Sequence, residues 1–374
     1  MKGPGASIEI KKQNRNHILK YILRSKTTSR QDIAAALGLS MPTILQNVKE
    51  LQELGVVEES GRFESTGGRK ANVITSISNA ALSIGVEITK NHVRIVLIDL
   101  SENILFHKRF VLPYRNTNEY YSQLALMIQA FIGEHPIDTR KIAGVGISIP
   151  GIMTEDATVI ADSHVLNIRN VSCKAISSLL PWKAYFVNDA NAAALAELRN
   201  LPQNSTMVYL SLSNSVGGAI FINGDIYRGI NQRSGEFGHM RIVHNGRPCY
   251  CGQLGCADAY CSALVLAPKE EKLEAFFDRL REGEEEKKAV WNEYMDHLAE
   301  LIINIRMSFD CDIILGGYVG CYMEPWLQEL QSKVAALDPF EQPGDVFLSA
   351  SRFKQESSAL GAAMIPMEEY MDRL

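Results

Sequence analysis

One short stretch of the chain, from Gly235 to Cys261, gathers the side chains best suited to hold a metal ion. It contains His239 together with Cys249, Cys251 and Cys256, so one imidazole and three thiols fall within eighteen residues. Thiolate sulfur and imidazole nitrogen are the usual donors of structural zinc sites, where four such ligands surround the ion as a tetrahedron. The spacing therefore predicts that these four residues bind a structural Zn²⁺ ion.

Disulfide bonding is the alternative use of these cysteines, and it depends on the compartment. The chain has seven cysteines, an odd number, and residues 1–18 lack the apolar core of a secretory signal. No segment approaches eighteen uninterrupted apolar residues, so we expect no membrane span and no membrane partner. We therefore expect a cytoplasmic, reducing location, in which clustered cysteines favour a metal over a disulfide.

The neighbours of the cluster indicate a tight loop with acidic surroundings. Gly246, Gly252 and Gly255 permit the sharp turns that bring several thiols together. Glu236 and Asp258 add two carboxylates beside the expected metal. The stretch therefore offers groups for a polar ligand as well as for an ion.

The elements that must position this stretch follow an α/β plan that occurs twice after residue 81. The first occurrence has β-rich runs at 83–88, 93–100 and 104–112, a helical stretch at 119–133 and a buried strand at 142–149. The second has strands at 207–212, 217–222, 225–227 and 310–315. Two α/β lobes with glycine turns at strand ends predict a cleft between them for a small ligand.

The N-terminal segment has a different character. Residues 1–75 carry 12 Lys and Arg against 7 Asp and Glu, a balance of +5, whereas the remainder carries 26 against 36, a balance of −10. Helical patterns at 14–24, 29–37 and 41–55 are separated by a short turn at Gly38, and strands near 56–57 and 71–74 follow. This order predicts a winged helix-turn-helix that binds double-stranded DNA, and a plain helical hairpin is the alternative.

The third helix of this head is the expected recognition helix. Thr43, Gln46 and Asn47 have short polar side chains that can exchange hydrogen bonds with base edges, and Lys49 adds a positive charge on an outer face. Arg69 and Lys70 lie in a basic Gly-Gly-Arg-Lys segment that could follow a phosphate backbone or enter a minor groove. A solvated linker is the alternative for that segment.

Three motifs make the body resemble the ROK family of repressors, open reading frames and sugar kinases. They are GEFGH at 235–239, CYCGQLGCAD at 249–258 and VNDANAAALAE at 187–197. The resemblance covers nearly the whole chain from about residue 14. It implies an α/β protein with a winged helix-turn-helix at 1–75 and a two-lobed, actin-like sugar-sensing body at 81–374. Lobe one would span about 81–188 plus the C-terminal helix, and lobe two about 189–354.

The resemblance also assigns roles to individual residues. It implies that His239 and the three cysteines are zinc ligands, and that Asp189 matches the aspartate that serves as base on the sugar hydroxyl in the family's kinases. Asn188, Glu236 and His239 match positions that hydrogen-bond the sugar. Asp258 stands where the family usually has glutamate, which leaves its contact with the ligand open. From the residues alone, Asp189 could also be a helix N-cap.

Two further departures from the family bear on catalysis. The first-strand turn that accepts ATP phosphate in family kinases has a glycine pair, whereas residues 87–90 here read Glu-Ile-Thr-Lys. A second phosphate turn, usually Gly-Thr-Gly, is Ser-Asn-Ser at 213–215. Glycine lets the backbone approach a phosphate closely, and Glu87 would repel one. We therefore expect a non-catalytic sensor rather than an enzyme.

The leading hypothesis is a sugar-responsive transcriptional regulator, more specifically a repressor of carbohydrate metabolism genes. A homodimer or higher homo-oligomer would place its heads on two operator half-sites, and a small sugar or sugar phosphate in the cleft would change operator affinity. The alternative is an ATP-dependent sugar kinase with an added DNA-binding head. A third possibility keeps the head and gives the cleft a protein partner in place of a sugar.

Overall fold

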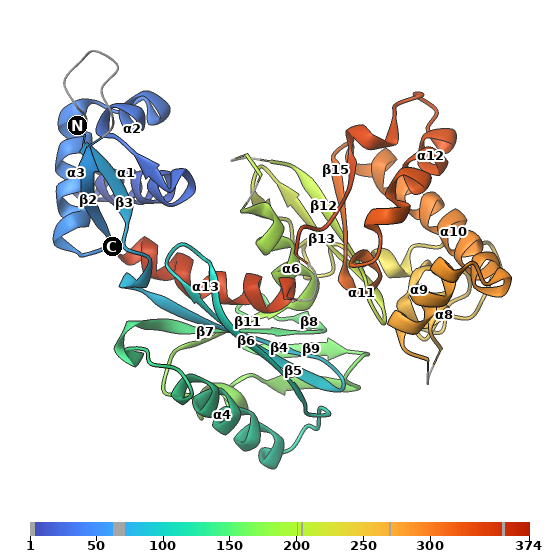
Figure 1. Ribbon diagram of the computed structural model, residues 1–374. Coiled ribbons are helices and arrows are strands. Elements are labelled where there is room, and N and C mark those ends of the chain that lie inside the picture. Colours follow the sequence, from blue (N-terminus) through green and yellow to red (C-terminus); the bar gives the residue numbers. More distant parts are fainter. Residues whose placement is uncertain (1–3, 63–71, 200, 203–204, 269–270, 354–355) are drawn as a thin grey trace.

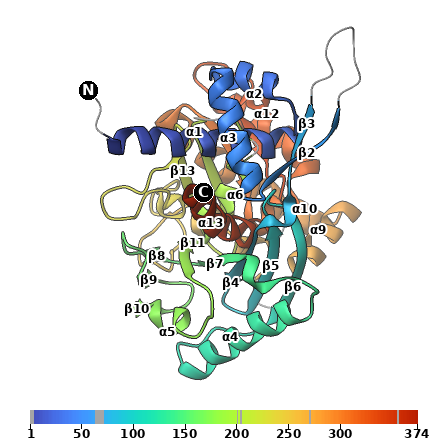
Figure 2. The same ribbon diagram turned by 90° about the vertical axis from the view of Figure 1, so that its left-hand side faces the viewer.

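The computed structural model describes residues 4–62, 72–199, 201–202, 205–268, 271–353 and 356–374. The chain forms a small N-terminal head and two α/β lobes, and the C-terminal helix runs from the junction of the lobes to the head (Figure 1). Figure 2 shows the head above the first lobe, with the C-terminus close to the head. Among the described residues, no helix is long and apolar enough to cross a membrane.

The head is built from three helices and a three-stranded sheet. Its helices are α1 (Pro4–Ser25), α2 (Arg30–Leu37) and α3 (Met41–Glu53), and its strands are β1 (Thr27–Thr28), β2 (Val57–Arg62) and β3 (Asn72–Ser76), in the order β1-β3-β2. The Ser29 hydroxyl accepts the Asp32 N–H and the Asp32 carboxylate accepts the Ser29 N–H, which is a complete capping box at the start of α2. Gly38, at φ 64°, ends α2. The predicted winged helix-turn-helix is confirmed, with β1 as an unpredicted third strand.

Lobe one is a five-stranded sheet in the order β11-β7-β4-β5-β6. Its strands are β4 (Leu82–Ile88), β5 (His92–Asp99), β6 (Ile104–Val111), β7 (Ile142–Ile149) and β11 (Ala184–Asn188). Strands β4, β5 and β6 are antiparallel, while β7 and β11 run parallel to β4. Helix α4 (Asn118–Gly133) covers one face, and a small sheet of β8 (Ile152–Met153), β9 (Val159–Ser163) and β10 (Ile168–Ser172) was not predicted.

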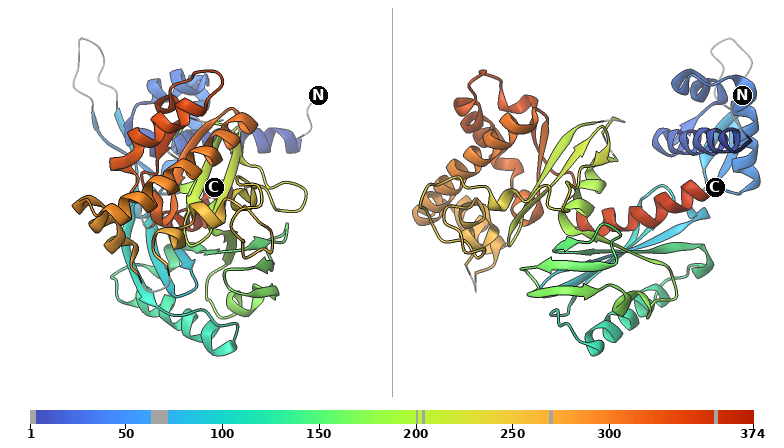
Figure 3. Two further views of the ribbon diagram at one scale, coloured as in Figure 1. Left: turned by 90° about the vertical axis from the view of Figure 1, so that its right-hand side faces the viewer. Right: turned by 180° about the vertical axis from the view of Figure 1, so that it is seen from behind.

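Lobe two repeats the plan with the order β14-β13-β12-β15-β16. Its strands are β12 (Met207–Leu212), β13 (Val216–Ile222), β14 (Asp225–Ile226), β15 (Asp312–Gly316) and β16 (Leu348–Ala350). The helices on its outer side are α9 (Leu273–Glu282), α10 (Glu285–Phe309) and α12 (Leu327–Leu337), and Figure 3 shows them on the side away from the head. Their apolar faces join β12 and β15 in one core that includes Trp291 and Phe276.

Two helices fill the space between the lobes: α6 (Asp189–Leu198) and α13 (Ser357–Arg373). Small residues let α13 approach its neighbours at backbone distance. A Cβ atom added to Gly146 of β7 would lie 1.8 Å from the Ala362 carbonyl oxygen, and one added to Gly361 would lie 1.6 Å from the Ala192 carbonyl oxygen. Such approaches are open only to glycine. Helix α13 is therefore held tightly against both lobe one and α6.

Candidate metal cluster, ligand cavity and DNA-binding head

The four expected metal ligands converge in lobe two. One donor atom from each of His239, Cys249, Cys251 and Cys256 lies within 4.8 Å of all the others. The Cys249 Sγ atom is 3.9 Å from His239 Nδ1, and the Cys251 and Cys256 Sγ atoms are 3.7 Å apart. No disulfide joins them. The cluster could hold a metal ion, and its soft sulfur and imidazole donors suit a four-coordinate site.

Local hydrogen bonds and a glycine shape the loop that carries the thiols. The Cys249 N–H donates to the Gln253 carbonyl at 2.8 Å, which closes a tight turn around Cys251. Gly255 has φ +79°, and a Cβ atom there would lie 1.7 Å from the Val243 carbonyl oxygen. Sequence-local turns thus bring the thiols together with little help from distant parts of the fold.

A cavity of about 320 Å³ lies between the lobes beside this cluster. Lobe one contributes the turn after β7, the end of β9 and the junction of β11 with α6, while lobe two contributes the start of β13 and the segment from Ser234 to His239. Of the five predicted ligand-binding residues, Asn188, Asp189, Glu236 and His239 line it, and Asp258 does not. The volume falls in the range of small-molecule sites.

Asn188 and Asp189 hold the lobe-one wall in place. The Asn188 side chain accepts the Asn191 N–H at 3.0 Å, so Asn188 is the N-cap of α6, and its amide donates to the Gly151 carbonyl at 3.0 Å. Asp189 is the first residue of α6 rather than its cap. Burial raises the pKa of Asp189 to about 6, and the negative charge of Glu236 raises it further. Hydrogen bonds from the backbone N–H groups of Ala190 and Asp189 lower the pKa and oppose this rise.

The metal cluster and the cavity share one histidine. The Nδ1 atom of His239 faces Cys249, whereas its Nε2 atom lies 3.4 Å from the Tyr250 hydroxyl and 4.0 Å from a Glu236 carboxylate oxygen. A metal bound through Nδ1 would leave Nε2 for the ligand side. Tyr250 also places its ring 5.6 Å from that of His164, at the end of β9. Sequence reasoning missed Tyr250 and His164, although Tyr250 stands between two cysteine ligands.

Asp258 has a structural task. Its carboxylate accepts the Val216 N–H at 2.6 Å, and the residue is only 6% exposed at the start of the short helix α7 (Asp258–Cys261). Burial raises the pKa of Asp258 to about 6, against the lowering effects of the Val216 N–H and of His239. The carboxylate therefore braces the start of β13, and the structure does not bring it to the cavity with the other four residues.

A second part of the interlobe cleft is filled by charged side chains. Glu87 accepts a hydrogen bond from Arg94 Nε at 3.3 Å, and Arg94 Nη1 donates to Glu356 at 3.2 Å. Burial raises the pKa of Glu87 to about 7, although Arg94 opposes the rise. Tyr318 approaches the same group of charges from lobe two. Residues 87–90 thus belong to the β4–β5 hairpin, and the Glu87 carboxylate there is already paired with Arg94.

The head presents the third helix on its surface. Gln46 and Lys49 are exposed, Thr43 is half-buried, and the Ser40 and Thr43 hydroxyls are 2.9 Å apart. Asn47 differs from the prediction: it is 2% exposed, and its amide donates to the Thr43 carbonyl at 2.8 Å. That side chain is turned into the head and does not face outward as a base contact requires. The predicted contacts Arg69 and Lys70 lie outside the described residues.

Leu45 is the residue of α3 that sequence reasoning overlooked. It is 48% exposed beside Gln46, whereas the inward face of α3 consists of Ile44, Val48 and Leu51. An apolar residue off the apolar face of the helix was the available signal. In the major groove such a side chain can contact a thymine methyl group.

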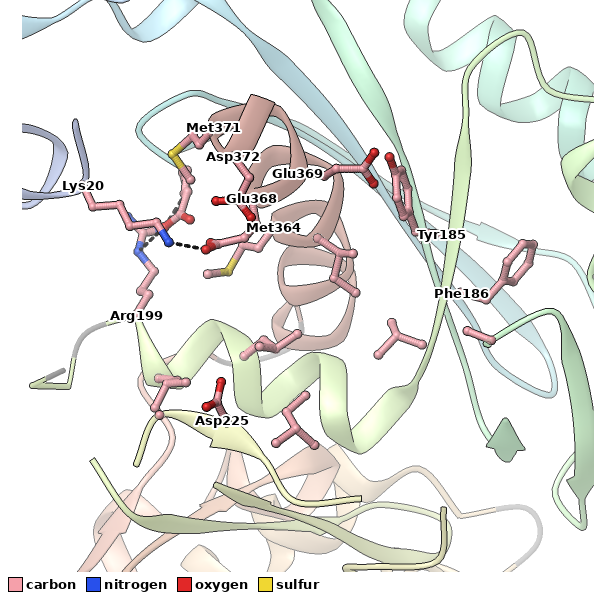
Figure 4. A pocket seen from close by; sticks show the side chains of 18 of the residues that line it. Lys20, Tyr185, Phe186, Arg199, Asp225, Met364, Glu368, Glu369, Met371 and Asp372 are labelled. Atoms are coloured by element: carbon pink, nitrogen blue, oxygen red, sulfur yellow. Dashed lines mark hydrogen bonds and ion pairs between the residues drawn. The ribbon is translucent and has the colours of Figure 1, made fainter. Parts of the chain in front are cut away.

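A larger hollow of about 2410 Å³ separates the head from much of the body (Figure 4). It is open to α1, to the end of α6 and to one side of α13, and Figure 4 shows Lys20, Arg199 and Glu368 on its walls. Lys20 is ion-paired with Glu368, and Asn16 donates to Asp372. At α13 these polar pairs therefore supplement the apolar cluster that the head shares with the body.

Comparison with known proteins assigns this chain to a family. The sequence profile of the ROK family matches residues 83–369. The chain belongs to the ROK family. A second profile, described as winged helix-turn-helix DNA-binding, matches residues 12–58 of this ROK protein. The resemblance inferred from the three motifs is confirmed.

Relatives with known names match most of this chain. The xylose repressor of Bacillus subtilis strain 168 is 31% identical over 271 residues, 71% of this chain and 70% of that protein. The transcriptional dual regulator NagC of Escherichia coli K12 is 25% identical over 260 residues, 69% of this chain and 64% of NagC.

Two solved structures show how far the fold is shared. A ROK transcriptional regulator described as a homologue of the E. coli MLC protein superposes with a TM-score of 0.77 at 20% identity, covering 97% of this chain and 98% of that one. A ROK glucokinase from Streptomyces griseus gives 0.67 at 20% identity, covering 76% of this chain and 99% of that one. The regulator thus shares head and body, and the kinase shares the body.

Proposed function

We propose that this ROK protein is a sugar-responsive transcriptional repressor. Its head would bind operator DNA through α3, and the cavity lined by Asp189, Glu236 and His239 would bind the sugar. The named repressors among its relatives support this function. The observation that carries it is a pair of helices, α6 and α13, that connect Asp189 at the cavity with residues that contact the head or the segment leaving it.

Helix α6 supplies the first connection. It begins with Asp189, and at its far end the Arg199 guanidinium donates to the carbonyls of Ser101 at 3.1 Å and Glu102 at 2.8 Å. The Ser101 hydroxyl is in turn 3.2 Å from the hydroxyls of Ser76 and Ser78, in the segment that leaves the head. A shift of α6 would therefore also move the turn at Ser101 and Glu102, which contacts the segment that leaves the head.

Helix α13 supplies the second connection. At its start the Ser358 hydroxyl donates to the Asp189 carbonyl at 3.0 Å, and at its end Glu368 and Asp372 hold α1. Met367 and Met371 share one apolar cluster with residues of the head. A sugar that favours one arrangement of the lobes would change the head position through both helices, provided that its affinity differs between the two arrangements.

We further propose that the cluster binds structural Zn²⁺ and that the protein acts as a homodimer or higher homo-oligomer. His239 and the three cysteines fit zinc in number and donor type. When bound, the ion would fix the orientation of the His239 ring and hold the Tyr250 loop at the cavity. Two heads would match two operator half-sites about one helical turn apart, which is how dimeric helix-turn-helix proteins bind.

The test measures binding of the purified protein to labelled DNA from its own promoter region, at several salt concentrations and with added sugars. We expect affinity that falls steeply with salt and a specific sugar that weakens it. Arg199→Gln should leave sugar affinity and sugar-free DNA affinity nearly unchanged but reduce the effect of the sugar on DNA binding. Lys183→Gln, which removes an exposed pair with Glu369 on α13, is the matched control. Absence of salt-sensitive DNA binding would refute the proposal.

A second candidate, an ATP-dependent sugar kinase with a DNA-binding head, rests on Asp189. This carboxyl lines the cavity, and a base with a pKa of about 6 could accept a hydroxyl proton near neutral pH. The Glu87 carboxylate paired with Arg94 opposes this function, because it occupies the region where an ATP phosphate would lie in a kinase. ADP release over a panel of hexoses and pentoses, well above background, would favour the kinase.

A further inference from the structure

The charges that line the cavity point to one class of sugar. Four carboxylates, those of Glu155, Asp162, Asp189 and Glu236, belong to its wall. Arg228 is the one arginine or lysine among the lining residues within the described part of the chain. Arg169 Nε lies 3.4 Å from the Asp162 carboxylate, and with that pair set aside the other three carboxylates still outnumber Arg228.

The surroundings of these groups strengthen the asymmetry. Arg228 is exposed, and it lines a shallow neighbouring hollow together with the exposed Glu155. Asp189 is half-buried and the Glu236 side chain is 43% exposed, and desolvation is the main cause of the raised pKa of each. Arg228 thus has a carboxylate neighbour of its own in that hollow, whereas Asp189 and Glu236 are close enough for their negative charges to repel each other.

The N-terminus of α6 is the remaining feature that could attract an anion, since helix N-termini favour negative charge. Its donors are already engaged. The Asn188 side chain accepts the Asn191 N–H, and the Asp189 carboxylate accepts the N–H groups of Ala190 and of Asp189 itself. The helix end is therefore satisfied by two side chains of its own first turn.

We infer that the cavity selects an unphosphorylated sugar and excludes its phosphate ester. This inference rests on the proposed function of the cavity as a sugar site. Hydroxyl groups donate hydrogen bonds to carboxylates, so a neutral sugar benefits from Asp189 and Glu236. A phosphate dianion in the same space meets these like charges, and like charges brought together at a binding site discriminate strongly against a ligand.

The test compares matched pairs: glucose, mannose, glucosamine and N-acetylglucosamine, each with its 6-phosphate, and xylose with its 5-phosphate. Melting temperature and release of promoter DNA are measured for the full chain at pH 7.5. We expect the free sugar of the responding pair to bind at least tenfold more tightly than its phosphate. A phosphate that binds as well or better overturns this inference and leaves sugar sensing intact. No response to either member of any pair overturns the proposed sugar sensing itself.

Two variants and one control identify which charged side chains set the preference for the free sugar. Arg228→Gln should leave affinity for the responding sugar within twofold, whereas a loss of tenfold or more would show that this cation holds the ligand and would overturn the inference. Glu236→Gln should weaken binding of the free sugar and reduce the ratio of its affinity to that of the phosphate at least threefold. Glu155→Gln, at the exposed mouth, is the matched control and should change that ratio less. An unchanged ratio in Glu236→Gln would also contradict the inference.

Discussion

Replacing Asp189 by asparagine tests whether the ionised carboxyl in the cavity lowers the free energy of unfolding. Burial raises its pKa from 3.8 to about 6, so the folded protein binds this proton more tightly than the unfolded chain does. At pH 7.5 the carboxyl is ionised in both states, and a difference of roughly two pH units at about 1.36 kcal/mol each amounts to roughly 3 kcal/mol of lost stability. The wild-type protein therefore loses stability as pH rises toward 6, and Asp189→Asn avoids that loss.

Asparagine keeps the size of the side chain and an acceptor for the N–H groups of α6. We expect Asp189→Asn to have a free energy of unfolding higher by up to about 3 kcal/mol at pH 7.5, and by only about 1 kcal/mol at pH 4.5. Urea denaturation of both proteins at the two pH values measures this, and each pH serves as the control for the other. Sugar binding should be lost in the variant. A stability difference that does not change with pH would refute the reasoning.

Four other substitutions have defined outcomes. Cys249→Ser should remove bound zinc, measured by metal analysis of the purified protein, and lower the melting temperature, because a structural metal stabilises only the folded loop; unchanged zinc content would contradict the metal assignment. Leu45→Ala should weaken operator binding by about 1 kcal/mol without changing its salt dependence, whereas Lys49→Gln should weaken binding to all DNA and reduce the salt slope by about 1; fluorescence anisotropy at several salt concentrations distinguishes them. Gly361→Ala should lower the free energy of unfolding by about 1–3 kcal/mol or more in urea denaturation, because the added methyl group would meet the Ala192 carbonyl. A free energy of unfolding near that of the wild type would show that α13 can shift freely.

The features that the sequence predicted best are local ones. The ligands of the metal cluster are close in sequence and separated by glycines, so spacing alone indicated that they could converge. The capped helices of the head were equally readable, since Ser29 and Gly38 act within a few residues. The family and the fold class followed from motifs and are confirmed.

Side-chain direction was much harder to predict. Asn47 lies only one residue from the exposed Gln46, but on a helix one residue turns a side chain by about 100°, which placed Asn47 against Thr43. Asp258 follows the metal loop directly, yet its carboxylate caps a strand from a distant part of the chain at Val216. Such contacts depend on tertiary packing that no local pattern encodes.

Helix α13 has a consequence for how the protein folds during its synthesis. Glycines of β4 and β7 lie directly against this helix, which spans residues 357–373, whereas the last strand of the lobe-one sheet ends at residue 188. All five strands of that sheet therefore leave the ribosome well before α13 has been synthesised, and the sheet face that α13 covers stays bare until then. Contacts of such long sequence separation form slowly, and exposed sheet faces aggregate. A segment translated long after the strands of lobe one is thus the one that completes that lobe, and the bare sheet face needs protection during the interval.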